Sequence, residues 1–191
     1  MKTAFPFGSA LAALASLAAC TTSESAGGGR GGVDIARFHL GEPIARAQIA
    51  IEPFDKADAN RPEYPAYAAA VSRQLSRLGW TVVTATRQTE QIALIDLEQG
   101  SRDAVAALTA ARIGRGVSAA PPSGASADVT ATLLEVAIRR RSDATVFWEG
   151  RAVAEAASGS PEAARTTVVE NLAEALFRDF PGESGRTIRV R

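Results

Sequence analysis

The chain has 191 residues, of which 46% are hydrophobic and 22% are charged, values typical of a globular protein. Its 21 basic and 21 acidic residues balance, so no strong net charge draws it to nucleic acid. The single histidine and single cysteine exclude a zinc site made of clustered His and Cys ligands, and they exclude a disulfide within the chain. We therefore expect no metal, no cofactor and no nucleic-acid partner.

The first 20 residues have the pattern of an export signal. Lys2 is followed by a run from 5 to 19 without an ionisable residue, and Leu17-Ala18-Ala19 comes directly before Cys20. A positive start, an apolar segment and a small-residue cleavage site are typical of a secretory signal. The run is shorter than the about 20 apolar residues that a membrane-spanning helix needs. Residues 1–19 are therefore predicted to be a signal peptide.

Leu17 to Cys20 resembles the lipobox of bacterial lipoproteins. The resemblance implies cleavage between Ala19 and Cys20, and attachment of lipid chains such as palmitate to Cys20. Two or more buried chains anchor a protein stably. Thr21 follows where Gram-negative sorting to the inner membrane uses Asp, which implies the outer membrane, with the protein facing the periplasm. The alternative is an ordinary secretory signal that happens to contain a cysteine.

Residues 20–32 are predicted to be the lipidated cysteine and a linker, because this segment is rich in Gly and Ser. Residues 33–191 are predicted to be a single domain. Within it, residues 48–54 read as a strand with Ile49 and Ile51 on one face. A helix is expected from Pro65 to Gly79, with an apolar stripe that includes Tyr67.

The middle of the chain predicts two more strands, at residues 80–83 and 91–97; the second is apolar on both faces, as in the interior of a sheet. Residues 103–113 are rich in Ala and predict either a helix or an extension of the preceding hairpin across the sheet. Residues 114–127 contain Pro-Pro and Gly and predict a loop.

Residues 129–141 and 145–155 predict a β-hairpin around Ser142-Asp143-Ala144. Alternation places Thr132, Leu134, Val136 and Ile138 on one face of its first strand, and Val146, Trp148, Gly150 and Ala152 together on its second. A helix is expected to begin at Ser160-Pro161 and to stop at Pro181, and residues 187–191 to form a last strand with Ile188 and Val190 inward.

This order of elements predicts an α+β fold: a two-layer domain in which a mixed, mainly antiparallel sheet carries two amphipathic helices on one face. The chain also resembles the bacterial lipoprotein family called domain of unknown function 4136. The resemblance covers most of residues 44–182 and is carried by Ile49 to Pro53, the segments 74–83 and 92–96, the hairpin 134–151 and the helix ending at Phe180-Pro181. The family has no assigned activity, so it implies no catalytic residue.

Candidate catalytic and metal-binding residues are few. His39 is expected to be a surface histidine, and Asp55 and Asp58 a solvated loop, since no Gly-centred cation loop follows them. Asp96 and Glu98 share one strand face, the arrangement of a general acid and base, although a solvated turn explains them equally. No Gly-X-Ser-X-Gly nucleophile motif occurs.

Arginines form the one surface cluster that the sequence predicts. Alternation turns Arg139 and Arg141 outward on one strand and Arg189 and Arg191 outward on another. If these strands are neighbours, the four side chains form an anion-binding patch, and the alternative is a charged face that discourages aggregation.

The expected function is that of a non-enzymatic, lipid-anchored binding or structural module whose partner is an envelope protein, peptidoglycan or an anionic lipid. The first alternative is a module that binds a small amphiphile. The second is a hydrolase that uses Asp96 and Glu98.

Overall fold

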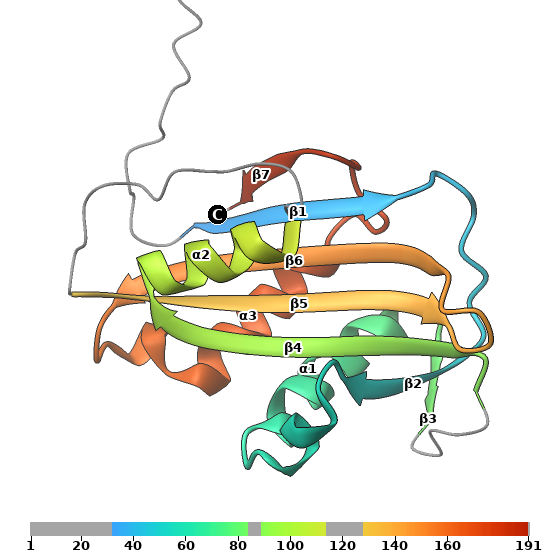
Figure 1. Cartoon of the computed structure of the whole chain (residues 1–191), viewed down its shortest axis with the longest axis horizontal. Coiled ribbons are helices and arrows are strands. Elements are labelled where there is room, and N and C mark those ends of the chain that lie inside the picture. The colour runs from blue at the N-terminus through green and yellow to red at the C-terminus, as the bar shows by residue number, and fades with distance from the viewer. Residues whose placement is uncertain (1–31, 84–88, 114–127, 191) are drawn as a thin grey trace, which may run out of the picture.

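Seven strands form one mixed sheet in the computed structural model, which describes residues 32–83, 89–113 and 128–190 (Figure 1). The order across the sheet is β3-β2-β4-β5-β6-β1-β7. The strands β2, β3 and β4 run parallel, whereas all other neighbouring pairs are antiparallel. The predicted α+β class with a mixed, mainly antiparallel sheet is confirmed. In chain order the strands are β1 (Val33–His39), β2 (Gln48–Pro53), β3 (Thr81–Val83), β4 (Gln91–Ser101), β5 (Val129–Arg140), β6 (Val146–Ala157) and β7 (Thr187–Val190).

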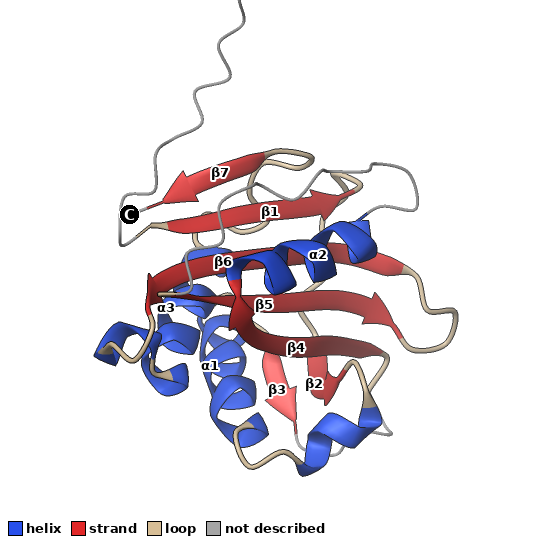
Figure 2. Ribbon diagram, turned by 60° about the vertical axis from the view of Figure 1, so that its left-hand side comes forward, coloured by secondary structure: helices blue, strands red, loops and turns tan. Residues whose placement is uncertain are grey.

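Helices cover both faces of this sheet. The helices α1 (Tyr64–Arg77) and α3 (Arg165–Phe177) contact each other and cover one face, while α2 (Arg102–Ile113) crosses the other face (Figure 2). The prediction of two helices on one face therefore misses the third helix. The Ala-rich segment predicted either a helix or a strand, and the structure has a helix there. Val105 of this helix is buried against Leu133 of β5.

The main core lies between the sheet and the pair α1 and α3. The stripe predicted for α1 is confirmed, since Tyr67, Val71 and Leu75 are buried. The strands contribute alternate residues, as expected from their two-residue period. The largest fully buried side chains of this core are Trp148, Tyr67, Ile35, Ile49, Leu75, Ile95, Leu134, Ile138, Leu172 and Leu176.

A bulge in the hairpin corrects one predicted face. The register shifts by one residue between Ile138, which pairs with Trp148, and Arg139, which pairs with Val146. The extra residue in β6 turns Val146 away from the face of Trp148. Val146 is therefore exposed, instead of lying with Trp148 as alternation predicted.

The first strand was not predicted from the sequence. Arg37 occupies a position of β1 on the core side, so the apolar alternation that begins with Val33 and Ile35 is interrupted. Arg37 is nevertheless only 3% exposed, and its guanidinium donates hydrogen bonds to the carbonyl oxygens of Ala175 and Leu176. Arg37 therefore links β1 to α3 by hydrogen bonds.

The start of the last helix also differs from the prediction. The Ser160 side chain accepts a hydrogen bond from the backbone of Ala163, but it caps a short 3₁₀ turn, η3 (Pro161–Ala163). The helix α3 itself begins at Arg165. Pro161 suits the first position of either kind of helix, which is why the sequence could not separate the two.

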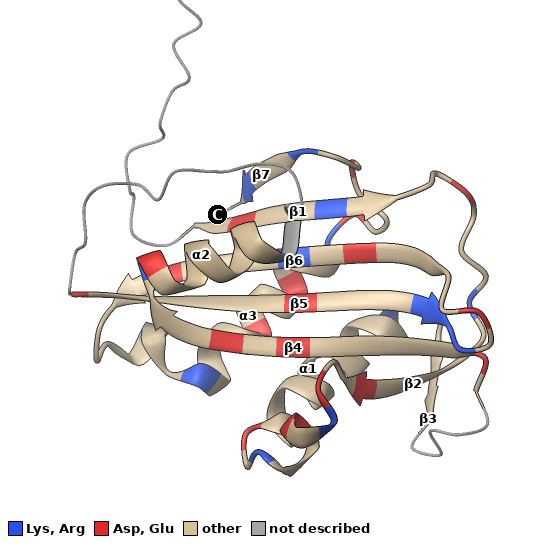
Figure 3. Cartoon of the chain, in the orientation of Figure 1, with Lys and Arg blue, Asp and Glu red and all other residues tan. Residues whose placement is uncertain are grey.

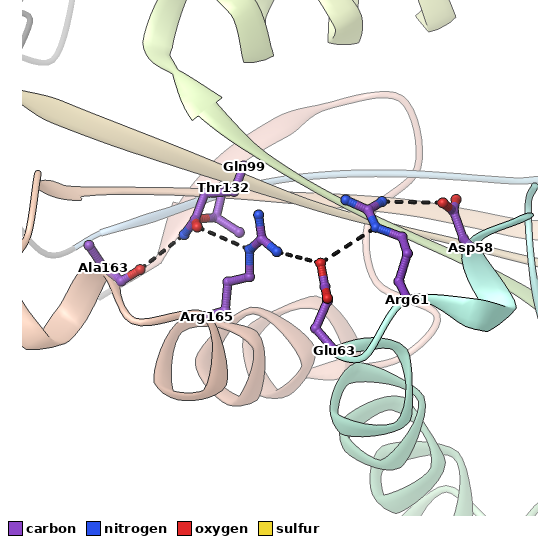
Figure 4. Close-up of polar contacts among 7 residues, drawn as sticks. All are labelled: Asp58, Arg61, Glu63, Gln99, Thr132, Ala163 and Arg165. Carbon is purple, nitrogen blue, oxygen red and sulfur yellow. Dashed lines mark hydrogen bonds and ion pairs between the residues drawn. The ribbon is translucent and has the colours of Figure 1, made fainter.

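A chain of polar contacts joins the amino-terminal ends of α1 and α3 to the sheet (Figure 4). Arg165 at the start of α3 donates to Glu63 at 2.5 Å and to Gln99 of β4 at 3.1 Å. A hydrogen bond with its own backbone, followed by Arg165 and Arg61, holds the pKa of Glu63 below its ordinary value. This network fixes how the helix layer sits on the sheet, and its members are Asp58, Arg61, Glu63, Gln99, Thr132, Ala163 and Arg165.

Candidate functional site: the sheet face that carries α2

Three buried charged residues lie side by side on the sheet face that carries α2. In the strand register Asp96 of β4 is opposite Glu135 of β5, and Glu135 is opposite Arg151 of β6. Their exposures are 4%, 5% and 7%. Figure 3 shows charged positions on all three strands. Charged side chains are rarely buried to this extent unless they are paired, so this row is the most unusual chemical feature of the described face.

Arg151 is the centre of the row. Its guanidinium forms ion pairs with Glu149 and Glu135, the latter with 3.5 Å between Nε and Oε1. It also lies over the ring of Phe38, 5.9 Å from the ring centroid. Within the described part of the chain, its buried Nε–H nevertheless has no hydrogen-bond acceptor. The Nε–H thus faces the Glu135 carboxylate at a distance longer than a normal hydrogen bond.

A hollow of about 360 Å³ lies between α2 and strands β6, β1 and β7. We call it the α2 hollow. Its walls are mostly apolar and small, and one end carries the ion pair of Arg102 with Glu155. The hydrogen bonds of this pair raise the pKa of Arg102 above its ordinary value. The apolar residues that line the hollow are Ala36, Val105, Ala106, Ala110, Ala131 and Val153.

A second hollow, of about 460 Å³, lies on the same face beside the carboxyl end of α2, and we call it the hairpin hollow. Glu135, Glu149 and Arg139 line it, together with apolar residues such as Leu94 and Phe54. Arg139, like Arg151, has a buried Nε–H without an acceptor among the described residues. Arg151 lines both hollows, so its side chain lies where the two adjoin.

The predicted patch of Arg139, Arg141, Arg189 and Arg191 does not form. The patch required β5 and β7 to be neighbours, but β6 and β1 lie between them. Arg141 donates to Glu52 and to the carbonyl of Thr89, whereas Arg189 lies 3.7 Å from Asp34. Arg191 lies outside the described residues.

The candidate acid and base, Asp96 and Glu98, lie on one face of β4 but face different neighbours. Asp96 is opposite Glu135, whereas Glu98 is opposite Leu133. The carboxylate that the sheet places beside Asp96 is therefore Glu135. No signal within β4 alone identifies that neighbour, because it comes from the next strand.

The remaining candidates have structural contacts. His39 Nδ1 accepts a hydrogen bond from the backbone N–H of Gly41, so its Nε2 carries the proton and donates to the carbonyl of Gly182 at 3.0 Å. Asp55 accepts from the backbone of Ala57 and caps the 3₁₀ turn η1 (Lys56–Asn60). Asp58 accepts from Arg61 at 3.3 Å.

Sequence reasoning missed Glu135, Glu149 and Arg151. One signal could have found two of them, because Glu135 and Arg151 lie equally far along the chain from Asp143 in the predicted turn. Each lies among small or apolar residues. A charge among such neighbours on two paired strands predicts a buried ion pair.

The predicted signal peptide and the cleavage site at Ala19 and Cys20 lie outside the described residues. Within residues 32–83, 89–113 and 128–190, no helix is long and apolar enough to cross a membrane. The same ranges contain no group of three or more His, Cys, Asp or Glu side chains placed to hold a metal ion.

Comparison with known proteins gives a relative in sequence and a likeness in fold. No family model matches the chain. An uncharacterized protein of Zymomonas mobilis subsp. mobilis is 26% identical over 212 aligned positions, which cover 83% of this chain and 80% of that protein. The resemblance to the domain of unknown function 4136 family therefore stays a prediction.

Two solved structures are similar to the fold. A PDZ domain protein from Parabacteroides distasonis matches 82% of this chain with a TM-score of 0.50 and 11% identity, and the chain spans only 38% of that protein. The PelC dodecamer from Paraburkholderia phytofirmans matches 73% of this chain with a TM-score of 0.41 and 10% identity. At 11% identity the likeness to the PDZ domain protein concerns the fold alone.

Proposed function

We propose that the chain is a non-enzymatic lipoprotein of the cell envelope that binds a small ligand on the sheet face carrying α2. Cys20 is the lipid attachment site in this proposal, and the outer membrane, with the domain facing the periplasm, is the location. The observation that carries the binding function is the position of Arg151, a buried arginine that lines both hollows. Binding sites typically combine apolar walls with a few such polar groups.

Lipid attachment is tested by metabolic labelling in a Gram-negative host. Wild-type chain is expected to take up labelled palmitate and to have a mature mass that begins at Cys20. Cys20→Ala is expected to take up no label and to keep residues 1–19, whereas the control Thr22→Ala behaves as wild type. A wild-type chain without label, or a labelled Cys20→Ala, would overturn the anchor.

Location is tested with Thr21→Asp. By similarity to Gram-negative sorting, this change is expected to move the labelled chain from the outer to the inner membrane in a density gradient. A wild-type chain already in the inner membrane would overturn the outer-membrane location, and it would leave the anchor itself intact.

Ligand binding on the α2 face is tested in cells with a diazirine amino acid in place of Thr109, which lines the α2 hollow and is closer in size to the probe than the lining alanines are. The matched control places it at Ala107, an exposed residue of the same helix outside the lining. After irradiation, a low-mass adduct at position 109 and none at position 107 would support the proposal. An adduct at neither position, or at both equally, would overturn binding at this face.

A further inference from the structure

We infer that the α2 hollow and the hairpin hollow together bind an anionic single-chain amphiphile, whose apolar tail fills the α2 hollow and whose acidic head contacts Arg151 and Arg139. This inference rests on the proposed binding function and names its ligand class. It is drawn from the walls of the two hollows and from the position of the one side chain that lines both.

The α2 hollow is suited to the tail. Its apolar walls come from α2 and from β1, β5 and β6, and four of the six apolar lining residues are alanines, which leave space beside the helix. Its volume of about 360 Å³ is at the lower end of the range of small-molecule sites, roughly 300–1,000 Å³. A single chain of medium length fits this volume, and a phospholipid with two long chains exceeds it.

The hairpin hollow is suited to the head. Glu135 and Glu149, the ion-pair partners of Arg151, line only the hairpin hollow, so the guanidinium of Arg151 is directed there. Arg139 lines the same hollow, so two guanidinium groups border it. Guanidinium groups pair well with the oxygens of a carboxylate or a phosphate, so the head is an acidic group of this kind.

Glu149 holds the place of the ligand head when the site is free. It pairs with Arg151, and its side chain is 27% exposed, compared with 7% for Glu135. Glu149 can therefore turn to solvent at a smaller desolvation cost than Glu135, and the ligand oxygen then takes its position on Arg151. Removing the charge of Glu149 should therefore strengthen binding, because the ligand no longer competes with it.

The test is calorimetric titration of the full chain in its Cys20→Ala form. The probes are decanoate and decyl phosphate, which carry the two head groups on one tail, decanol as the tail alone, and acetate as a head alone. We expect one site per chain for decanoate or decyl phosphate, at least tenfold weaker binding of decanol, and no binding of acetate. The stronger of the two charged probes identifies the head as a carboxylate or a phosphate.

Matched variants locate the site. Ala106→Leu fills the α2 hollow and should weaken binding of the charged probe at least tenfold. Ala107→Leu changes an exposed site on the same helix and should leave this binding unchanged. Arg139→Gln should lower the affinity for the charged probe to that for decanol. Arg140→Gln, which lies outside both hollows, should leave this affinity unchanged. Glu149→Gln should bind the charged probe severalfold more tightly. Thermal unfolding of each variant verifies that it folds.

Either of two results would overturn the inference: wild type that binds neither charged probe, or pairs of variants that do not differ. A low-mass adduct at position 109 in cells, without binding of these probes, would overturn the ligand class and leave the proposed function standing. The absence of that adduct would overturn the proposed function itself.

Discussion

The Arg37 guanidinium closes the carboxyl end of α3, because its Nε donates to the carbonyl oxygen of Leu176 at 2.9 Å. Its Nη2 donates to the carbonyls of Ala175 and Arg178 at 3.0 and 2.8 Å. The last carbonyls of a helix have no partner within the helix, and a cation near them is favourable. One side chain from β1 thus completes an element more than 130 residues later in the chain.

Arg37→Met is expected to lower the free energy of unfolding by about 2–4 kcal/mol, because it leaves buried carbonyl oxygens without donors. Urea unfolding followed by circular dichroism measures the loss. The control is Arg186→Met, whose side chain is 67% exposed, and it should change the stability by less than about 0.5 kcal/mol. Equal effects of the two substitutions would contradict the capping role.

Gly150→Ala is expected to destabilise the chain by about 1–3 kcal/mol through overpacking. A Cβ atom at Gly150 would lie 2.8 Å from Cδ1 of Leu176 and would also collide with the Trp148 indole. Gly100→Ala is the matched control, because the nearest atom to its added Cβ is 3.7 Å away, on Ala104. Calorimetric melting should therefore separate two glycine substitutions that both lie in strands, and equal melting temperatures would argue against the close approach.

Ionisation of Tyr64 is expected to lower the free energy of unfolding at alkaline pH. Burial, followed by the neighbouring Tyr67 and Glu52, raises its pKa from 10.0 to about 12. The unfolded chain ionises first, so the stabilisation is complete below pH 10 and is lost as the pH rises to about 12. Tyr64→Phe should lose less stability over this window in urea unfolding. A variant with the same slope as wild type would refute the assignment.

Protonation of Asp143 is expected to lower the free energy of unfolding at acid pH. Its hydrogen bonds with Thr145, followed by that with Arg140, lower its pKa from 3.8 to about 2. The folded state therefore binds this proton less readily, and the stabilisation present above pH 3.8 is lost as the pH falls towards 2. Asp143→Asn should flatten the stability curve in this range, and the carboxyl chemical shift of Asp143 should follow a pKa of about 2 instead of 3.8.

Periodicity predicted those elements whose buried residues are apolar. The stripe of α1 and the alternation of Leu134, Val136 and Ile138 in β5 needed no long-range information. Periodicity failed at β1, because the buried residue there is Arg37, whose partners lie in α3. It did not decide between helix and strand for residues 103–113, which lie in α2, because this Ala-rich segment has no clear apolar periodicity.

The candidate site depended on strand order, which the sequence does not contain. The predicted patch of four arginines depended on the assumption that β5 and β7 are neighbours, and the structure places β6 and β1 between them. The pairing of Glu135 with Arg151 could have been counted from the hairpin turn. The position of Arg151 beside two hollows could not be predicted in this way. The residues that line these hollows include parts of α2 and β1, which are distant from Arg151 along the chain.

The pairing of Val33 with Val190 has a mechanical consequence under the proposed lipid anchor. The chain enters the domain at Val33, at the start of a strand that is hydrogen-bonded to β6 on one side and to β7 on the other. A pull on the preceding residues along the strand loads both ladders in shear, and many hydrogen bonds must break together. An edge strand pulled at right angles would open one bond at a time. If the proposed lipid anchor holds the chain at its amino-terminal side, the force therefore acts at a point that resists it well.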